Sequence, residues 1–339
     1  MKIVFAIIML FALTRCLVAQ DNNEKAKQSP PLRLGMIGLD TSHAIAFTQL
    51  LNDPRNPHHV PGARVVAGYP GGSPDVEASA TRVDKFTAEL RDKWGVEIVD
   101  DIPTLCEKVD AVLLTSVDGR PHLQQVRPVF AAKKRVFIDK PMAGSLEDVK
   151  EIFRLSKESG VPCFSSSCYR WMEGLKRTDL GAVTGCDSYS PATIEPHHPD
   201  LFWYGIHGVE ALFTVMGPGC VSVTRVNSPG TDVVVGLWKD GRIGAFRGIR
   251  QGKSAAGVTV FCEKGTFTAK PDHRNIYKGL VQETVKFFRT GVPPVSPEET
   301  IQIYSFMDAA DKSKQQGGIP IPLEPVPTAS GESVEQTAK

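Results

Sequence analysis

The chain has 339 residues, of which 41% are hydrophobic and 23% are charged, and its formal net charge is +1. This length exceeds one typical domain and the composition is that of a globular protein, so we expect two domains of ordinary size. The near-zero net charge argues against nucleic acid or an anionic membrane surface as a partner.

The N-terminus has the pattern of a secretory signal peptide. Lys2 precedes an apolar stretch over residues 3–13 that is too short to span a bilayer, and small residues place the cleavage point after Ala19. We therefore expect residues 1–19 to be removed on Sec-type export, and the mature protein to be periplasmic or secreted. Residues 20–31 are polar and end in prolines, which is typical of a flexible tether.

Seven cysteines occur in the chain. Cys16 raises the alternative of a lipoprotein, but Arg15 beside it does not fit a lipid-attachment box. In an exported chain Cys163 could pair with Cys168 or Cys186, although burial as small hydrophobic residues is the simpler expectation. The cysteine spacings match no zinc motif.

Short apolar strands alternate with amphipathic helices after the tether. Strands are predicted at residues 32–37, 64–69, 97–99, 110–115, 136–138 and 162–165, and helices at 41–51, 83–94, 102–108, 123–132 and 146–159. This alternation predicts a Rossmann-type, doubly wound α/β parallel sheet over residues 32–166.

The pattern changes near residue 170. Strand-like segments follow one another at residues 221–226, 232–238, 242–247 and 257–262, with helices at 205–216, 280–290 and 297–315. Consecutive strands without helices between them predict an α+β domain with a mainly antiparallel sheet over residues 167–322. Residues 323–339 are expected to form a disordered tail.

A lysine stands at the end of the apolar strand that closes with Ile138. It belongs to the segment Asp139-Lys140-Pro141, at the edge where open α/β sheets place their ligands. A partly desolvated lysine there can take part in proton transfer. The alternative is a surface lysine that merely ends a strand.

Five short motifs occur in order along the chain. They are Asp118-Gly119-Arg120-Pro121-His122, Asp139-Lys140-Pro141, Cys168-Tyr169-Arg170-Trp171, Gly205-Ile206-His207-Gly208-Val209-Glu210 and residues 291–299. In these motifs the chain resembles the Gfo/Idh/MocA family (glucose–fructose oxidoreductase, inositol dehydrogenase and rhizopine-catabolism proteins) over residues 32–322. The family carries glutamate where Asp139 stands and aspartate where Glu210 stands.

The resemblance implies an oxidoreductase that transfers a hydride between NAD or NADP and a sugar, a cyclitol or a derivative. It also implies that Lys140 and His207 flank the reacting carbon in a cleft, with His207 accepting the hydroxyl proton and Lys140 polarising the oxygen. Taken alone, His207 would be a capping or core histidine. Arg170, Trp203 and Tyr204 are expected to contact the substrate, although the two aromatic rings could instead pack against the sheet.

The dinucleotide fingerprint departs from the usual pattern. In Gly38-Leu39-Asp40-Thr41-Ser42-His43 only the first glycine of G-x-G-x-x-G is present, and Asp40 brings a negative charge where backbone normally approaches pyrophosphate. Thr41, Ser42 and the helix N-terminus could still hold an anion. Alternatively, Asp40 is simply the helix N-cap. The acid expected after the second strand is also missing, because Tyr69-Pro70 stands there.

The cofactor-binding residues expected from these motifs are Gly35, Gly38, Asp40, Thr41, Ser42, His43, Thr115, Ser116, His122 and Asp139. Free NAD is scarce outside the cytoplasm, so an exported member of the family is expected to keep its nucleotide tightly bound. Two alternatives stay open. One is a hydrolase or lyase that uses bound NAD as a transient oxidant, and the other is a non-catalytic carbohydrate-binding protein that has lost the nucleotide.

One loop gathers potential metal ligands. Glu195, His197, His198 and Asp200 could hold a divalent ion, but exposed residues on the substrate side are the favoured interpretation and no metal is expected. The resemblance further implies a homo-oligomer formed through the C-terminal sheet. No stable membrane span is expected.

Overall fold

The computed structural model describes residues 30–175, 177, 179–253 and 255–324. The predicted signal peptide, nearly all of the predicted tether and the predicted tail beyond residue 324 lie outside these residues. The predicted division at residues 166/167 falls between the last strand of the first sheet and a 3-10 helix, η1 (Cys168–Trp171). These domain boundaries stay predictions.

The first sheet has six parallel strands in the order β3-β2-β1-β4-β5-β6. They are β1 (Leu32–Ile37), β2 (Ala63–Tyr69), β3 (Glu97–Ile98), β4 (Ala111–Leu114), β5 (Arg135–Ile138) and β6 (Cys163–Ser165). All four residues of β4 are buried, as expected for a strand covered on both faces. The doubly wound sheet is thus confirmed, and its order reverses between β1 and β4, where such folds open a ligand crevice.

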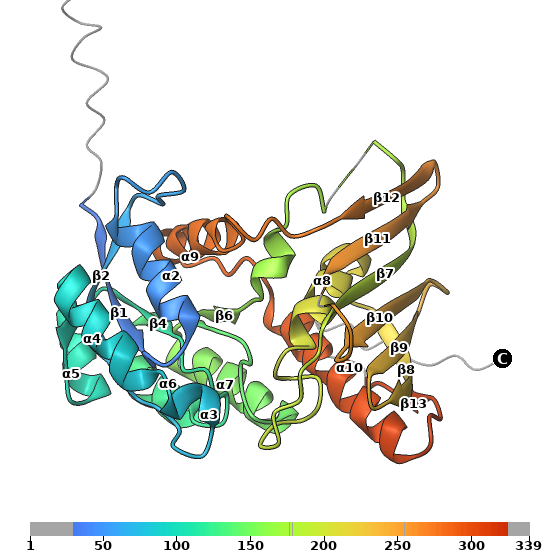
Figure 1. Ribbon diagram of the computed structural model, residues 1–339, viewed down its shortest axis with the longest axis horizontal. Coiled ribbons are helices and arrows are strands. Elements are labelled where there is room, and N and C mark those ends of the chain that lie inside the picture. Colours follow the sequence, from blue (N-terminus) through green and yellow to red (C-terminus); the bar gives the residue numbers. More distant parts are fainter. Residues whose placement is uncertain (1–29, 176, 178, 254, 325–339) are drawn as a thin grey trace, which may run out of the picture. The chain divides into compact units, whose positions relative to one another are not determined.

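Helices cover both faces of this sheet (Figure 1). They are α2 (Ser42–Asn52), α3 (Glu77–Ala80), α4 (Val83–Trp94), α5 (Ile102–Lys108), α6 (His122–Ala131) and α7 (Leu146–Ser159). Local signals set their starts: the side chains of Thr41, Asp101 and Ser145 accept hydrogen bonds from the first turns of α2, α5 and α7. The N-cap of α2 is therefore Thr41, and the alternative that made Asp40 the cap is wrong.

The second sheet has seven strands in the order β12-β11-β7-β10-β9-β8-β13. They are β7 (Val183–Pro191), β8 (Cys220–Ser228), β9 (Thr231–Trp238), β10 (Ile243–Ile249), β11 (Gly257–Cys262), β12 (Gly265–Ala269) and β13 (Ile321–Pro322). Every pair is antiparallel except β7 with β10, which run parallel. The predicted mainly antiparallel sheet is confirmed.

Three further helices follow η1, and two of them reach elements of the first half of the chain. α8 (Ile206–Met216) packs on β7 and β10, and α10 (Pro297–Gln315) packs on β8 and also reaches α7. α9 (Lys278–Thr290) returns to the first sheet, where it contacts α2 and β5 (Figure 1). Aromatic contact accompanies this return, since the Phe164 and Phe287 ring centroids are 4.9 Å apart. The late part of the chain therefore borders the crevice of the first sheet.

The cysteines of the described chain are free: Cys106, Cys163, Cys168, Cys186 and Cys220 are buried and Cys262 is half-buried. Burial as small hydrophobic residues is thus the outcome for five of them. No helix among the described residues has the length and apolar character needed to cross a bilayer.

Candidate active site

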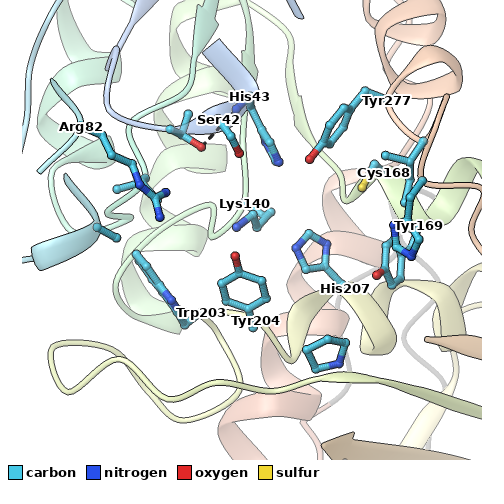
Figure 2. A pocket seen from close by; sticks show the side chains of 16 residues that line it. Ser42, His43, Arg82, Lys140, Cys168, Tyr169, Trp203, Tyr204, His207 and Tyr277 are labelled. Carbon is cyan, nitrogen blue, oxygen red and sulfur yellow. Dashed lines mark hydrogen bonds between the residues drawn. The ribbon is translucent and has the colours of Figure 1, made fainter. Parts of the chain in front are cut away.

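A cavity of about 260 Å³ lies at the carboxyl-end edge of the first sheet. Residues from five separate segments line it: His43 after β1, Lys140 after β5, Tyr169 in η1, His207 in α8 and Tyr277 before α9. Figure 2 shows these side chains pointing toward one another. The structure thus brings Lys140 and His207 together, although they are far apart in the sequence.

Lys140 is 7% exposed, and its ammonium lies over two aromatic rings. Its Nζ is 5.0 Å from the ring centroid of Tyr204 and 5.9 Å from that of Trp203. Within the described residues no oxygen accepts a hydrogen bond from this ammonium, so its donors are free for an oxygen of a ligand in the cavity. A buried cation with open donors is suited to hold a developing alkoxide.

His207 is 8% exposed and is held by a hydroxyl. Its Nδ1 lies 2.7 Å from Oγ of Ser167, while the rings of Tyr169 and Tyr204 flank it at centroid distances of 5.1 and 5.7 Å. Burial, with the neighbouring charge of Lys140, lowers the pKa of His207 well below its ordinary value. The imidazole is therefore neutral at pH 7.

His43 and Asp139 form a close pair at the same cavity. Nδ1 of His43 is 2.5 Å from Oδ2 of Asp139, whose other oxygen accepts the backbone N–H of Lys140 at 2.8 Å. The ring of Tyr277 meets His43 edge-on, with 4.8 Å between centroids. Sequence reasoning placed both residues at the cofactor; it gave no sign that they pair.

The turn before α2 is closed by a buried carboxylate. Asp40 is completely buried and accepts hydrogen bonds from the backbone N–H of Val117 at 2.9 Å and from Oγ of Ser79 at 2.6 Å. Burial raises the pKa of Asp40, and the two hydrogen bonds oppose that rise. The carboxylate thus ties the segment after β2 to the segment after β4, across the crevice of the sheet.

Of the ten residues predicted at the cofactor, only Thr41, Ser42 and His43 line the cavity, and the seven that do not include Gly35, Thr115, Ser116 and His122. Gly35 is inside β1, where an added Cβ would lie 2.3 Å from a Leu105 methyl carbon of α5. Thr115 Oγ1 donates to the carbonyl of Gly38 at 2.8 Å. Ser116 Oγ donates to Gln125 at 2.9 Å.

His122, the fourth, is fully buried between two carbonyl oxygens. Its ring nitrogens lie 3.1 Å from the oxygen of Met142 and 3.0 Å from that of Ser116. Burial lowers the pKa of His122. This histidine holds together the loops that follow β4 and β5.

The three residues predicted to contact the substrate are divided. Trp203 and Tyr204 line the cavity. Arg170 does not, because its guanidinium is buried in ion pairs with Glu210 at 2.5 Å and Glu299 at 2.6 Å. Within the Gly-x-His-x-x-Glu motif, His207 thus lines the cavity and Glu210 forms an ion pair with Arg170.

Sequence reasoning missed several lining residues. Tyr169 precedes Arg170 in the Cys168–Trp171 motif, so the motif itself could have indicated it. Tyr277 and Arg82 have no motif around them, and only the packing of α9 and α4 brings them to the cavity. Arg82 points inward in Figure 2 and has no recorded hydrogen-bond partner among the described residues.

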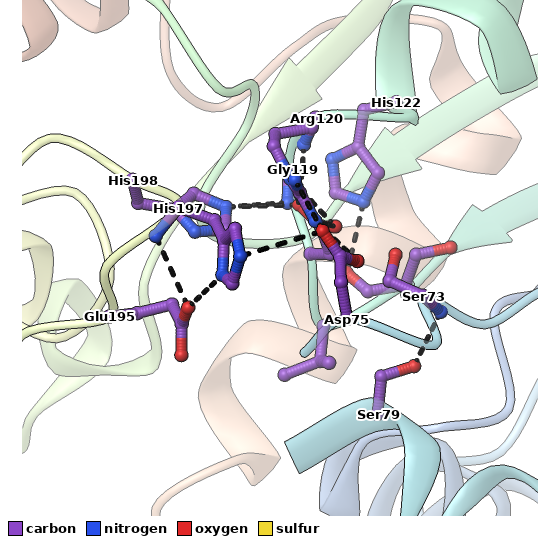
Figure 3. A network of polar contacts seen from close by, with 12 residues as sticks. Ser73, Asp75, Ser79, Gly119, Arg120, His122, Glu195, His197 and His198 are labelled. Atoms are coloured by element: carbon purple, nitrogen blue, oxygen red, sulfur yellow. Dashed lines mark hydrogen bonds and ion pairs between the residues drawn. The ribbon is translucent and has the colours of Figure 1, made fainter. Parts of the chain in front are cut away.

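A polar network borders the same crevice (Figure 3). The guanidinium of Arg120 bonds to Asp118 and, at 2.9 Å, to both oxygens of Asp75, which follows β2. Nε2 of His198 is 3.1 Å from Asp118, and His197 contacts Glu195 at 2.6 Å.

These contacts account for the loop that offered potential metal ligands. No group of three or more His, Cys, Asp or Glu side chains suited to a metal ion occurs in the described part of the chain. The loop instead ties the second half of the chain to the loops after β2 and β4.

Residues 33–167 match the Gfo/Idh/MocA family model, which is described as an oxidoreductase family with an NAD-binding Rossmann fold. Over these residues the match agrees with the predicted resemblance, with the oxidoreductase class, and with NAD or NADP as the cofactor. No protein with a curated description matches the sequence.

Solved structures share the fold at low sequence identity. A probable dehydrogenase from Thermotoga maritima has a TM-score of 0.71 at 23% identity, covering 87% of this chain and 100% of its own. Myo-inositol dehydrogenase from Lactobacillus casei, in complex with NAD(H) and myo-inositol, has a TM-score of 0.69 at 18% identity, covering 88% and 99%. Myo-inositol 2-dehydrogenase from Lactobacillus plantarum has a TM-score of 0.71 at 16% identity, covering 87% and 100%.

The turn between β1 and α2 fits the phosphates of a dinucleotide in two respects and opposes them in one. A Cβ at Gly38 would lie 2.2 Å from the backbone nitrogen of Ser116, so only glycine allows this close turn. The N-terminus of α2, the hydroxyl of Ser42 and the guanidinium of Arg82 can hold an anion. The carboxylate of Asp40 opposes it.

Proposed function

Because residues 33–167 match the model of the Gfo/Idh/MocA family of NAD-binding oxidoreductases, we propose that the chain oxidises or reduces a secondary alcohol of a sugar, a cyclitol or a derivative. One observation carries the proposal. Lys140, with open ammonium donors, and neutral His207 converge on one buried cavity from the two halves of the chain. The inositol dehydrogenases of the same fold support a polyol as the substrate class.

Ser42, Arg82 and the N-terminus of α2 would hold the phosphates of NAD or NADP, and the nicotinamide, when bound, supplies the hydride acceptor. Lys140 donates hydrogen bonds to the substrate oxygen and stabilises the charge that develops there. His207 contacts the same oxygen or its neighbour. Trp203 and Tyr204 present ring faces on which the apolar face of a sugar or cyclitol can lie.

The first experiment asks whether the protein carries a nucleotide. Purified full-length protein is denatured, and the released small molecules are examined by absorbance and mass. We expect NAD(H) or NADP(H), and the protein should then reduce or oxidise the bound nucleotide when mixed with a panel of inositols, aldoses and uronic acids. Protein free of nucleotide that shows no thermal shift with either dinucleotide would contradict the proposal.

A carbohydrate-binding protein without turnover is the second candidate, and Asp40 favours it. This carboxylate already occupies the Val117 N–H and the Ser79 hydroxyl beside the turn. In that case Trp203, Tyr204 and Lys140 would bind a sugar, and the chain would bind no nucleotide. Calorimetry with sugars on nucleotide-free protein separates this candidate from the first.

We also propose that the chain is exported, as the signal pattern of residues 1–19 indicates, and that its nucleotide is tightly bound for this reason. N-terminal sequencing of the mature protein should begin near Gln20. A mature chain that begins at Met1 in the cytoplasm would remove both the export proposal and the argument for a retained cofactor.

The open face of the second sheet is the proposed contact between subunits. Leu237 of β9 is 45% exposed and pairs in register with Ile243 of β10, which is 57% exposed, with Val235 beside them on the same face. We expect a dimer by light scattering, and Leu237→Lys should shift it toward monomer. A wild type that is monomeric at high concentration contradicts this assignment.

A further inference from the structure

The pair formed by His43 and Asp139 has the geometry of an oriented proton acceptor. Both side chains are buried, at 7% and 3% exposure, and Nδ1 of His43 is 2.5 Å from Oδ2 of Asp139. The other oxygen of Asp139 accepts the backbone N–H of Lys140. An ionised carboxylate can only accept hydrogen bonds, so it calls for N–H donors on both of its oxygens.

This arrangement fixes the tautomer of His43. Since Asp139 accepts from Nδ1, that nitrogen carries the proton and Nε2 keeps its lone pair. The ring is clamped by Phe47, stacked at 5.3 Å between centroids, and by Tyr277, edge-on at 4.8 Å. Because His43 lines the cavity, this lone pair is available to a hydroxyl placed there (Figure 2).

The position of the pair within the chain couples it to the lysine that holds the ligand. Asp139 and Lys140 are consecutive residues at the end of β5, so one short segment positions both the carboxylate and the ammonium. A ligand oxygen that bonds to Lys140 is thereby brought to the cavity that His43 lines. His43 itself occupies the third glycine position of the dinucleotide fingerprint, where glycine normally allows the helix to pack closely on the strand.

The other histidine of the cavity is less suited to take a proton. His207 has a hydroxyl, not a carboxylate, at its Nδ1, and its pKa is lowered by burial and by the charge of Lys140. A general base works best when its affinity for the proton matches the working pH. His43, in contrast, has the carboxylate of Asp139 at its Nδ1.

We infer that His43 is the catalytic base of this site, that Asp139 is its positioning residue, and that a hydroxyl of the substrate donates to Nε2 of His43. The inference rests on the proposed function for its redox step. In that step the substrate O–H bond breaks, the proton goes to Nε2, and the O–H electron pair forms the second C–O bond as hydride leaves the carbon for the nicotinamide. The titratable and charged groups around His43 are Asp139, Lys140, His207, Tyr277 and Arg82.

The tautomer can be measured without any turnover. In protein labelled with ¹⁵N-histidine, the His43 signals are identified by their loss in His43→Gln. We expect Nδ1 protonated and Nε2 bare near pH 7, and Asp139→Asn should shift the proton to Nε2, because an amide can donate to Nδ1. Asp118→Asn is the matched control, since it alters the buried His198 pair outside the cavity lining. A protonated Nε2 in the wild type overturns the inference.

The kinetic experiment compares His43→Ala with the wild type on a polyol that the protein converts. General-base help is worth about 10²–10⁴-fold in kcat. We expect a loss in that range with KM changed only a few-fold, a displaced lower limb of the kcat/KM pH profile, and partial rescue by added imidazole. Turnover of His43→Ala within threefold of the wild type overturns the inference.

The two proposals fail in different ways. A wild type that converts no polyol and holds no nucleotide contradicts the proposed oxidoreductase. The nitrogen measurement still decides the His43–Asp139 pair in that case, with binding of a sugar expected to shift the Nε2 resonance. A sugar that binds without moving that resonance contradicts the pair as the acceptor.

Discussion

Lys140 is the residue on which the proposed chemistry depends most directly. Its ammonium has no acceptor among the described residues and rests on the rings of Trp203 and Tyr204. Lys140→Met keeps the apolar stem and removes the charge. Loss of the electrostatic support is expected to cost about 3 kcal/mol in the transition state, which is about 10²-fold in kcat. Steady-state kinetics checks this, with Lys150→Met on the exposed surface of α7 as the control; equal losses in both variants would point to a non-specific effect.

Asp40 decides how well the turn accepts a nucleotide. Asp40→Asn removes the charge but can keep both hydrogen bonds, since its oxygen can accept from Val117 and its amide can donate to Ser79. We expect NAD(H) to bind about tenfold more tightly, a gain of about 1.4 kcal/mol. Calorimetry on nucleotide-free protein measures this.

Asp40→Ala serves as the comparison for Asp40→Asn. It loses both hydrogen bonds and should lower the free energy of unfolding by about 1–3 kcal/mol. Unchanged affinity in Asp40→Asn would mean that the carboxylate does not face the phosphates.

Residue motifs predicted part of the site and missed the rest for a physical reason. Lys140 follows β5 and His207 lies in the first turn of α8, and the pattern of both elements is visible in the sequence. Tyr277 and Arg82 reach the cavity only through the docking of whole helices. Single-sequence patterns carry no information about that docking, and the pairing of His43 with Asp139 depends on two strands meeting across β4.

At the level of elements, the β1–α2 turn is the most constrained connection. Gly38 has φ of +83°, and an added Cβ would lie 2.2 Å from the nitrogen of Ser116. Gly38→Ala should therefore destabilise the protein by more than the roughly 1 kcal/mol of a simple left-handed alanine. Gly95→Ala is the matched control, because its φ is +65° and no atom lies within 4 Å of the added Cβ. Urea unfolding should show a larger loss in the free energy of unfolding for Gly38→Ala than for Gly95→Ala, because only the first variant adds a clash to the backbone strain. Equal losses in the two variants would contradict the close approach of Gly38 to Ser116.

Elements with strong periodicity were predicted well, and those held by their neighbours were not. Val83–Trp94 and Pro297–Gln315 begin and end as expected. β7 was missed because its sequence is rich in Ser, Thr and Asp and contains a glycine. It is a strand because β10 and β11 pair with it on both sides. α3 has only four residues, too few for a visible period.

For the whole molecule, burial of neutral histidine makes stability depend on pH. The pKa of His207 is lowered in the fold, so below about pH 6.5 the unfolded chain binds a proton that the folded one does not. The free energy of unfolding should therefore fall by up to about 1.4 kcal/mol per pH unit below that point. His207→Gln should remove the part of this slope that His207 contributes and leave the part from buried His122, as urea unfolding between pH 7.5 and 5 can show.

An opposing group makes the comparison with the variant necessary. Burial raises the pKa of Asp311 to about 6, so its contribution grows as pH falls through the same range. The contribution of His207 is therefore the difference between wild type and His207→Gln. Above pH 7.5 the difference in free energy of unfolding between the two proteins should not change with pH. If it also stays unchanged down to pH 5, His207 takes up its proton in the folded protein as it does in the unfolded chain, which contradicts the prediction.

The return of α9 to the first sheet also has a consequence for biosynthesis. The cavity joins His43, from an early strand–helix turn, to Tyr277, which a ribosome adds only after most of the chain has been made. A growing chain that has folded its first sheet still lacks one wall of the cavity. A ligand that binds the folded protein stabilises it by mass action, and the full effect is available only once Tyr277 has closed this wall. Tight retention of the proposed nucleotide is therefore expected only in the compartment where the chain completes its fold.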